Sequence, residues 1–143
     1  MWIGRVARGD VIDQMRPALQ VDVVASTKEA LIRLGDVAEI TEPYAFQELL
    51  WCEQLGLCKT GEGGKLMDSG ATRIDGDIPV NPSGGVLAMN PYVSRGLYRL
   101  AEVALQIKGQ AGERQIDNVV KTGLAHGTHG FAGQFHAVAI LGG

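Results

Sequence analysis

The 143-residue chain is predicted to fold as an α/β domain whose last two strands pair antiparallel. Apolar residues recur at helical spacing over residues 97–107, and Gly109 ends this run. Two later stretches, 118–125 and 134–141, have the composition of strands, and the glycine-rich residues 126–133 between them are typical of a hairpin connection. Shorter strand and helix patterns alternate before these, an order typical of helices layered on a sheet.

Residues 1–20 show no clean period and are predicted to be a lead-in segment before a domain over residues 21–143. Residues 21–25 are predicted to be either a short strand or the approach to a helix. Residues 26–29 then have the form of a capping box, with Ser at the N-cap and Glu three positions later. Residues 37–41 alternate as in a strand, which Pro43 ends because proline lacks a backbone donor.

A helix is predicted over residues 46–55, where the apolar residues lie on one side and Gly56 supplies the stop. Residues 58–82 are rich in glycine and are predicted to be irregular. Because a structureless connection of that length is unusual inside a compact domain, we expect this segment to be functional or to form an interface.

The segment that most affects the functional prediction is residues 81–96, which runs into the helix that begins near Ser94. Its sequence Asn-Pro-Ser-Gly-Gly contains a glycine pair that lets the backbone approach a ligand closely, and Pro82 and Pro91 restrict the chain on either side. On glycine and proline alone, an ordinary tight connection is the alternative.

Composition excludes some classes of function. The net charge is -3, the isoelectric point is about 5.5 and the basic residues are scattered, so we expect neither nucleic-acid binding nor attachment to an anionic membrane. No secretory signal and no apolar run of membrane-spanning length is evident, which predicts a cytoplasmic location. Cys52 and Cys58 have no second pair with which to bind zinc; reduced thiols are favoured over a disulfide.

Residues 81–85 (Asn-Pro-Ser-Gly-Gly) and the helix after them resemble the C-terminal half of thiolase-superfamily enzymes, especially the acetyl-CoA acetyltransferase-like and lipid-transfer-protein-like branch. In thiolases this segment leads to Gly-His-Pro-x-Gly-Ala-Thr-Gly. Residues 39–44 (Glu-Ile-Thr-Glu-Pro-Tyr) are similar to the family's Glu-x-His/Asn-Asp/Glu-Ala-Phe segment, and the glycine-rich connection lies where thiolases have a Cys-x-Gly loop. The resemblance covers residues 21–141 and implies a mixed five-stranded sheet with helices on both faces.

The chain departs from the thiolase pattern where the chemistry lies. Aligning Pro91 with the family's proline puts Asn90 in place of the activating His, and an amide cannot accept a proton near neutral pH. Tyr92 lies in the altered motif and Tyr44 just after the first motif; thiolase-like aldolases suggest that both are phenol acids or bases, the alternative being semi-buried aromatics. His126 is predicted to be an active-site hydrogen-bonding or acid/base group.

The resemblance also implies a substrate, a coenzyme A thioester, with no bound cofactor and no metal. The residues expected to contact this substrate come from the two glycine-rich segments: Ser83, Gly84, Gly85, Thr128 and His129. Thiolases take up an acyl group on a cysteine of the N-terminal half, which this sequence does not contain. On its own, the chain is therefore not expected to be active.

The leading hypothesis is the C-terminal component of a thiolase-like acyltransferase acting on acyl-CoA thioesters, with the nucleophilic cysteine supplied by an N-terminal half or partner chain. The alternatives are a noncatalytic subunit that binds acyl-CoA or lipid or acts as a scaffold, and a thiolase-like retro-aldol lyase that uses tyrosines. Since an isolated half would expose the apolar surface that meets its sister half, we expect a homo- or hetero-oligomer.

Overall fold

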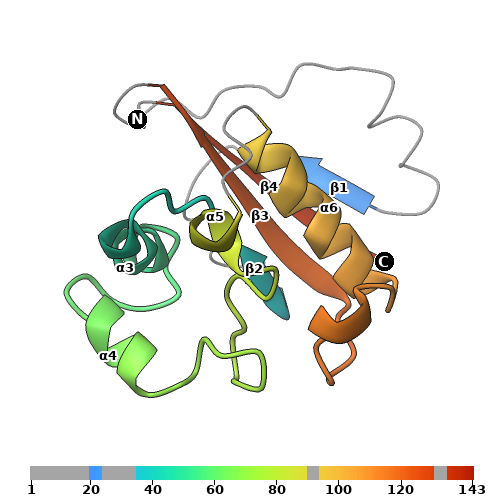
Figure 1. Ribbon diagram of the computed structural model, residues 1–143, viewed down its shortest axis with the longest axis horizontal. Helices are drawn as coiled ribbons and strands as arrows, with labels where there is room; N and C mark the ends of the chain where they lie inside the picture. The colour runs from blue at the N-terminus through green and yellow to red at the C-terminus, as the bar shows by residue number, and fades with distance from the viewer. Residues whose placement is uncertain (1–19, 24–34, 90–93, 131–134) are drawn as a thin grey trace.

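The computed structural model describes residues 20–23, 35–89, 94–130 and 135–143, which form a mixed sheet with helices on both faces (Figure 1). The sheet order is β1 (Gln20–Val23), β4 (Phe135–Gly142), β3 (Thr122–His129) and β2 (Val37–Glu39). β2 is parallel to β3, whereas the other two pairs are antiparallel. The α/β class and the C-terminal antiparallel pair are thus confirmed.

The described residues contain four strands, so the expectation of five is not met there. At the β2 edge the chain makes a single bridge, Ala38 to Val80, where a further strand would lie. The backbone of Ala38 donates to the carbonyl of Pro79 at 2.9 Å and accepts from Asn81 at 2.8 Å. Pro79 and Pro82 flank this bridge and lack the N–H groups that a longer ladder needs, so the pairing stops there.

The helices are α3 (Ala45–Gln54), α4 (Gly63–Asp68), α5 (Gly85–Ala88) and α6 (Arg95–Ile107), with a 3₁₀ turn at Gly112–Arg114. α3 confirms the helix predicted over residues 46–55, and α6 confirms the one predicted from Ser94. The irregular segment predicted over residues 58–82 is wrong in part, because α4 lies inside it. Tertiary contacts stabilise this short helix: Glu53 accepts the Gly63 N–H at 3.0 Å, and Leu66 and Met67 pack on the core.

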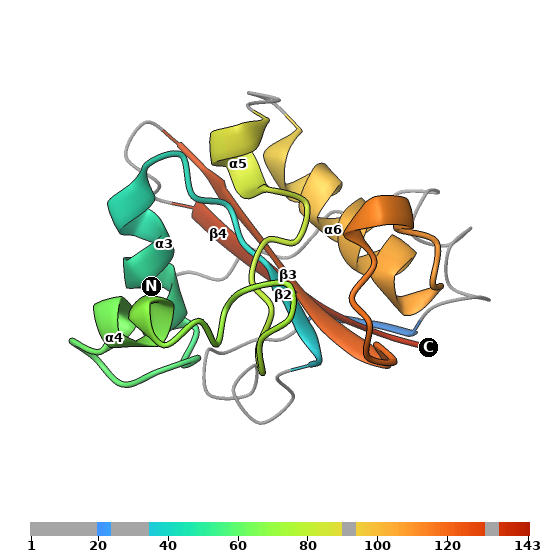
Figure 2. The same ribbon diagram turned by 60° about the horizontal axis from the view of Figure 1, so that its bottom comes forward.

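Two apolar clusters lie on opposite faces of the sheet, and Figure 2 shows α3 and α6 on either side of it. Successive side chains of a strand point to opposite faces, so Leu124 packs toward α3 and Ala125 toward α6. The first cluster joins the sheet to α3 through Cys52 and Leu55, and the second joins it to α6 through Val103. Both faces of the sheet are therefore covered.

The buried face of α6 differs from the apolar stripe that the sequence predicts. Leu97, the first residue of that stripe, is 60% exposed. Later members of the stripe do face the core, because Ala104 is buried and Leu100 and Ile107 pack on the second cluster. Polar residues at helical spacing are buried beside them, namely Arg99, Glu102 and Gln106. These polar residues have partners inside the fold. Glu102 pairs with Arg114 at 3.0 Å, and the Gln106 amide bonds to the backbone of Arg114 and Ile116, which follow the helix.

The predicted connection over residues 126–133 is also corrected, because residues 126–129 belong to β3. His126 is paired with Val138 and Thr128 with His136 in the antiparallel register. Gly127 serves helix packing within the strand: a Cβ placed on it would lie 3.1 Å from the Cα of Gly96 in α6. Glycine in this position therefore marks a close approach of helix and strand.

Two sequence predictions, the lead-in segment and the helix begun by the capping box, fall almost wholly outside the described residues. Within the described ranges, no helix combines the length and apolar character needed to cross a bilayer.

Truncating Leu124 tests the core that α3 covers. The side chain is fully buried in the first cluster, so Leu124→Ala should lower the free energy of unfolding by roughly 2–5 kcal/mol. Chemical denaturation measures the loss. Val119→Ala, at a position that is 79% exposed, is the control and should change stability by no more than about 0.5 kcal/mol. Equal effects of the two substitutions would contradict this packing.

Candidate functional site

The candidate site lies where the parallel strands β2 and β3 end at the same edge of the sheet. Thr41 and Glu42 follow β2, and His126 lies in the second half of β3. The Thr41 hydroxyl donates to the His126 carbonyl at 2.9 Å, and Glu42 accepts from the start of α5. Ligands of α/β proteins bind at the carboxyl ends of strands, so this edge is where chemistry is expected.

Glu39 connects β2, the loop after Val80 and helix α6. One carboxylate oxygen accepts the backbone N–H of Ser83 at 2.9 Å, and the other accepts the Ser83 hydroxyl at 2.8 Å. The second oxygen also lies 3.0 Å from Nη1 of Arg99, and both side chains are fully buried. The Glu39 side chain thus binds both the loop that contains Ser83 and helix α6, which contains Arg99.

The electrostatics of this pair are dominated by burial. Desolvation raises the pKa of Glu39 to about 7, against the opposing effects of Arg99 and of the two bonds from Ser83. Within the described part of the chain, neither Nε nor Nη2 of Arg99 has a hydrogen-bond partner. A buried guanidinium with Glu39 as its ion-pair partner is strongly dependent on that carboxylate.

Glu42 stabilises the start of α5. Its Oε1 accepts the backbone N–H groups of Val86 at 2.5 Å and Leu87 at 3.2 Å, and burial raises the pKa of the carboxyl. Gly85 is required beside it, since a Cβ there would overlap the carboxylate and the φ angle is 68°. Asn81, at φ 52°, completes the arrangement by accepting the Ile40 N–H at 2.7 Å.

His126 is buried, and both of its ring nitrogens face protein groups. Nδ1 lies 3.5 Å from the backbone N of Thr41, and Nε2 lies 3.1 Å from Nδ1 of His136. Burial, and next the nearby His136, lower the pKa of His126 to about 3. The imidazole is therefore neutral near pH 7, and hydrogen bonding to a substrate requires one of these contacts to open.

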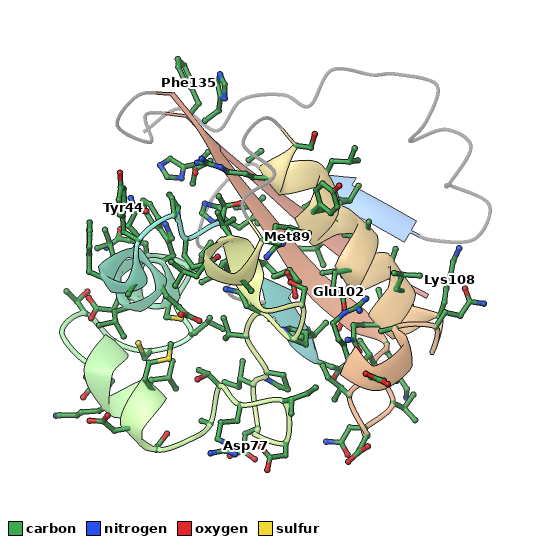
Figure 3. The ribbon with its side chains drawn as sticks, in the orientation of Figure 1. Tyr44, Asp77, Met89, Glu102, Lys108 and Phe135 are labelled. Atoms are coloured by element: carbon green, nitrogen blue, oxygen red, sulfur yellow. The ribbon has the colours of Figure 1, made fainter. Side chains whose placement is uncertain are left out.

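The other predicted site residues are distributed around this edge. Tyr44 precedes α3, is 63% exposed and stacks on Phe46; Figure 3 shows it beside the start of the helix, away from the sheet. Thr128 is half-buried and His129 exposed, near the end of β3. Asn90 and Tyr92 lie outside the described residues, which resume at Ser94.

The substrate contacts predicted in the Asn-Pro-Ser-Gly-Gly segment have internal roles. Ser83 donates hydrogen bonds from its N–H and its hydroxyl to Glu39. Gly84 takes the left-handed conformation at φ 89° before α5, and Gly85 leaves space for the Glu42 carboxylate. These residues therefore shape the loop, and their contact with a substrate stays a prediction.

No activated thiol is present in the chain. Burial raises the pKa of Cys52 to about 12 and also raises that of Cys58, and both cysteines are free. Since the thiolate is the nucleophile, neither is suited to carry an acyl group. Among the residues that the structure describes, no group of three or more potential metal ligands is found.

Sequence reasoning missed the Glu39–Arg99 pair and the contact between the two histidines. Alternation within β2 gave a signal for Glu39, because its side chain faces the sheet surface opposite to Ala38 and Ile40. Arg99 gave no such signal, since an arginine on an amphipathic helix is normally solvent-exposed. His136 is ten residues from His126, and the antiparallel register brings the two together.

The model of the thiolase C-terminal domain-like family matches residues 10–143. The chain is 41% identical over 134 residues to acetyl-CoA acetyltransferase of Methanothermobacter thermautotrophicus. This alignment covers 91% of this chain and 35% of that protein. It is 40% identical over 92 residues to sterol carrier protein 2 of Rattus norvegicus, covering 64% and 17%, respectively.

Among solved structures, the Ltp2-ChsH2(DUF35) aldolase has a similar fold, with a TM-score of 0.64 and 26% sequence identity. The match covers 77% of this chain and 27% of the aldolase chain. The chain therefore spans about a third or less of the length of these relatives.

Removing the cation beside Glu39 tests the buried pair. Arg99→Met should destabilise the fold by roughly 3–5 kcal/mol at pH 8, because Glu39 must then either stay ionised without its buried partner or take up a proton inside the fold. Adding Glu39→Gln should recover part of this loss, as a double-mutant cycle by denaturation would measure. Arg73→Met, in an exposed pair with Asp75, is the matched control and should cost less than about 1 kcal/mol. A strictly additive double mutant would contradict the pairing.

The raised pKa of Glu39 predicts the sign of a pH effect. Between pH 4.5 and about 7 the folded chain binds a proton at Glu39 that the unfolded chain has released. The stability due to this group is thus fully present below pH 4.5 and is lost as pH rises through 7. His126, whose pKa is lowered, acts in the opposite sense below pH 6.5. Stability measured against pH should therefore fall more between pH 5 and 8 in wild type than in Glu39→Gln; an identical slope would contradict the prediction.

Proposed function

Because this chain belongs to the thiolase C-terminal domain-like family, we propose that it is the C-terminal component of a thiolase-like acyltransferase that acts on acyl-CoA thioesters. The observation that carries the proposal is the convergence of three segments on one sheet edge: the turn after β2, the second half of β3 and the loop of residues 81–89. Two buried glutamates fix that loop, and this rigidity favours a positioned binding surface over an idle connection.

The nucleophile of the proposed reaction comes from outside this chain. Both cysteines have raised pKa values, and Cys52 is buried in the core under α3. An acyl group passing from coenzyme A to protein needs a thiolate that attacks the thioester carbonyl and expels the coenzyme A thiolate. In this proposal an N-terminal half or partner chain supplies that thiolate, and the sheet edge described above completes the site.

An exposed apolar surface on α6 supports association with such a partner. Leu97 and Tyr98 are both exposed near the start of this helix, whereas Val103 and Ala104 are buried in the second cluster. The relatives are about three or more times longer than the aligned part, which is compatible with a sister half that covers this surface. Burial of exposed apolar area is the usual driving force for such assembly.

A second candidate, a retro-aldol lyase, is favoured by the substitution in the central motif and by one similar structure. Asn90 stands in the sequence where the activating His is expected, Tyr92 follows two positions later, and the similar solved structure is named an aldolase. In this reaction a tyrosinate accepts the proton of a β-hydroxyl, the adjacent C–C bond breaks to give a carbonyl compound, and the thioester enolate takes up a proton. Tyr44, exposed just before α3, is the other phenol that this candidate would use.

Reconstitution with a complementary polypeptide tests the leading proposal. The chain is purified with each candidate partner that contains a thiolase-like cysteine, and acetyl-CoA is added. We expect one acyl group to appear on the partner's cysteine, by mass spectrometry, when both chains are present and not with either alone. Replacing that cysteine by Ala should abolish the adduct, while Asp75→Asn on an exposed loop of this chain should leave it unchanged.

Two results would change the assignment. No adduct with any co-purifying partner would contradict the acyltransferase. Release of a ketone or aldehyde from a β-hydroxyacyl-CoA, lost in Tyr92→Phe, would instead favour the lyase; an unchanged rate in both Tyr92→Phe and Tyr44→Phe would remove that candidate.

A further inference from the structure

His136 forms a stacked, hydrogen-bonded pair with His126 on the face of the sheet that α3 covers. The ring centroids are 5.4 Å apart with an interplanar angle of 8°, and Nε2 of His126 lies 3.1 Å from Nδ1 of His136. Because His136 is opposite Thr128 in the register, it is the diagonal neighbour of His126 on the same face. Trp51 packs on both rings, at 5.5 Å and 4.7 Å between centroids.

The second nitrogen of His126 decides which ring donates the shared proton. Nδ1 of His126 faces the backbone N of Thr41 at 3.5 Å, and a backbone N–H can only donate. Nδ1 is therefore the acceptor, so the proton of the neutral imidazole is on Nε2 and is donated to His136. His136 accepts with Nδ1, which leaves its own proton on Nε2.

We propose that His136 is a positioning residue of the site, which holds His126 as the neutral Nε2–H tautomer and thereby keeps its Nδ1 directed at the turn after β2. That turn, residues 40–44, carries Glu42 and Tyr44. Thr41 is bound to His126 twice, through its backbone N–H and through its hydroxyl, so the orientation of the ring and the path of the turn are linked. The catalytic consequence rests on the proposed function; the tautomer itself does not.

A chain of contacts then connects a half-buried side chain to the site. It runs from His136 through the buried His126 ring to Thr41 and the turn. Burial and the nearby His136 both disfavour a charge on His126, which agrees with a ring that acts as a fixed neutral spacer. Removing the acceptor at position 136 leaves the Nε2–H of a buried ring unpaired, and the ring can recover a bond only by turning or by changing tautomer.

Imidazole NMR of the full chain tests this directly, without substrate. Long-range proton–nitrogen correlations distinguish Nδ1–H, Nε2–H and doubly protonated rings, and substitution of His129 assigns the three histidines. Wild type should show His126 as the Nε2–H form at pH 7. His136→Gln, whose carbonyl can accept the same proton, should retain it, and His136→Leu should lose it. Phe135→Leu, an adjacent exposed position, is the control and should not alter the spectrum.

Two outcomes would overturn the proposal: an Nδ1–H form of His126 in the wild-type chain, or an unchanged Nε2–H form in His136→Leu. If His136→Leu fails to fold, the wild-type spectrum and rescue by His136→Gln still decide. In the reconstituted enzyme, His136→Leu should reduce turnover and His136→Gln should restore it. A correct tautomer together with no acyl transfer in wild type would count against the proposed function and leave the positioning role standing.

Discussion

The burial of the Glu39 carboxylate between β2 and α6 is the constraint on which the rest of the site depends. A carboxylate in this position needs compensation, and it has a cation from α6 and two donors from Ser83. Each partner comes from a different segment, so satisfying one charge fixes the relative positions of a strand, a loop and a helix. This explains why an arginine of α6, Arg99, is fully buried in the fold.

Glu42 extends the same principle to the next turn of chain. Its carboxylate satisfies the first free N–H groups of α5, a short helix that would have little stability alone. With Asn81 bound to the backbone after β2, the loop is attached to that strand and its continuation at three points. The two glutamates belong to the motif that resembles thiolases, and their observed role is to position the loop.

Local patterns predicted most of the fold. The spacing around α3 and α6 and the composition of β3 and β4 are properties of neighbouring residues, so these elements are found with shifts of a few positions. The misses are long-range. Gly127 has the sequence context of a turn because its contact with Gly96 is invisible in the sequence, and no local pattern predicts α4 because its stability comes from Glu53 and the core. The segments named by the resemblance lie together at one sheet edge, but only the strand register could reveal the His126–His136 contact.

Two buried glutamates hold the loop of residues 81–89 rigidly at the carboxyl edge of the sheet. Residue-resolved amide hydrogen exchange measures this rigidity. The amides of Ser83 and Val86, which donate to Glu39 and Glu42, should exchange as slowly as those in the middle of β3, although they lie in a loop and a four-residue helix. Exchange of both amides at the rate of an exposed loop would contradict the account.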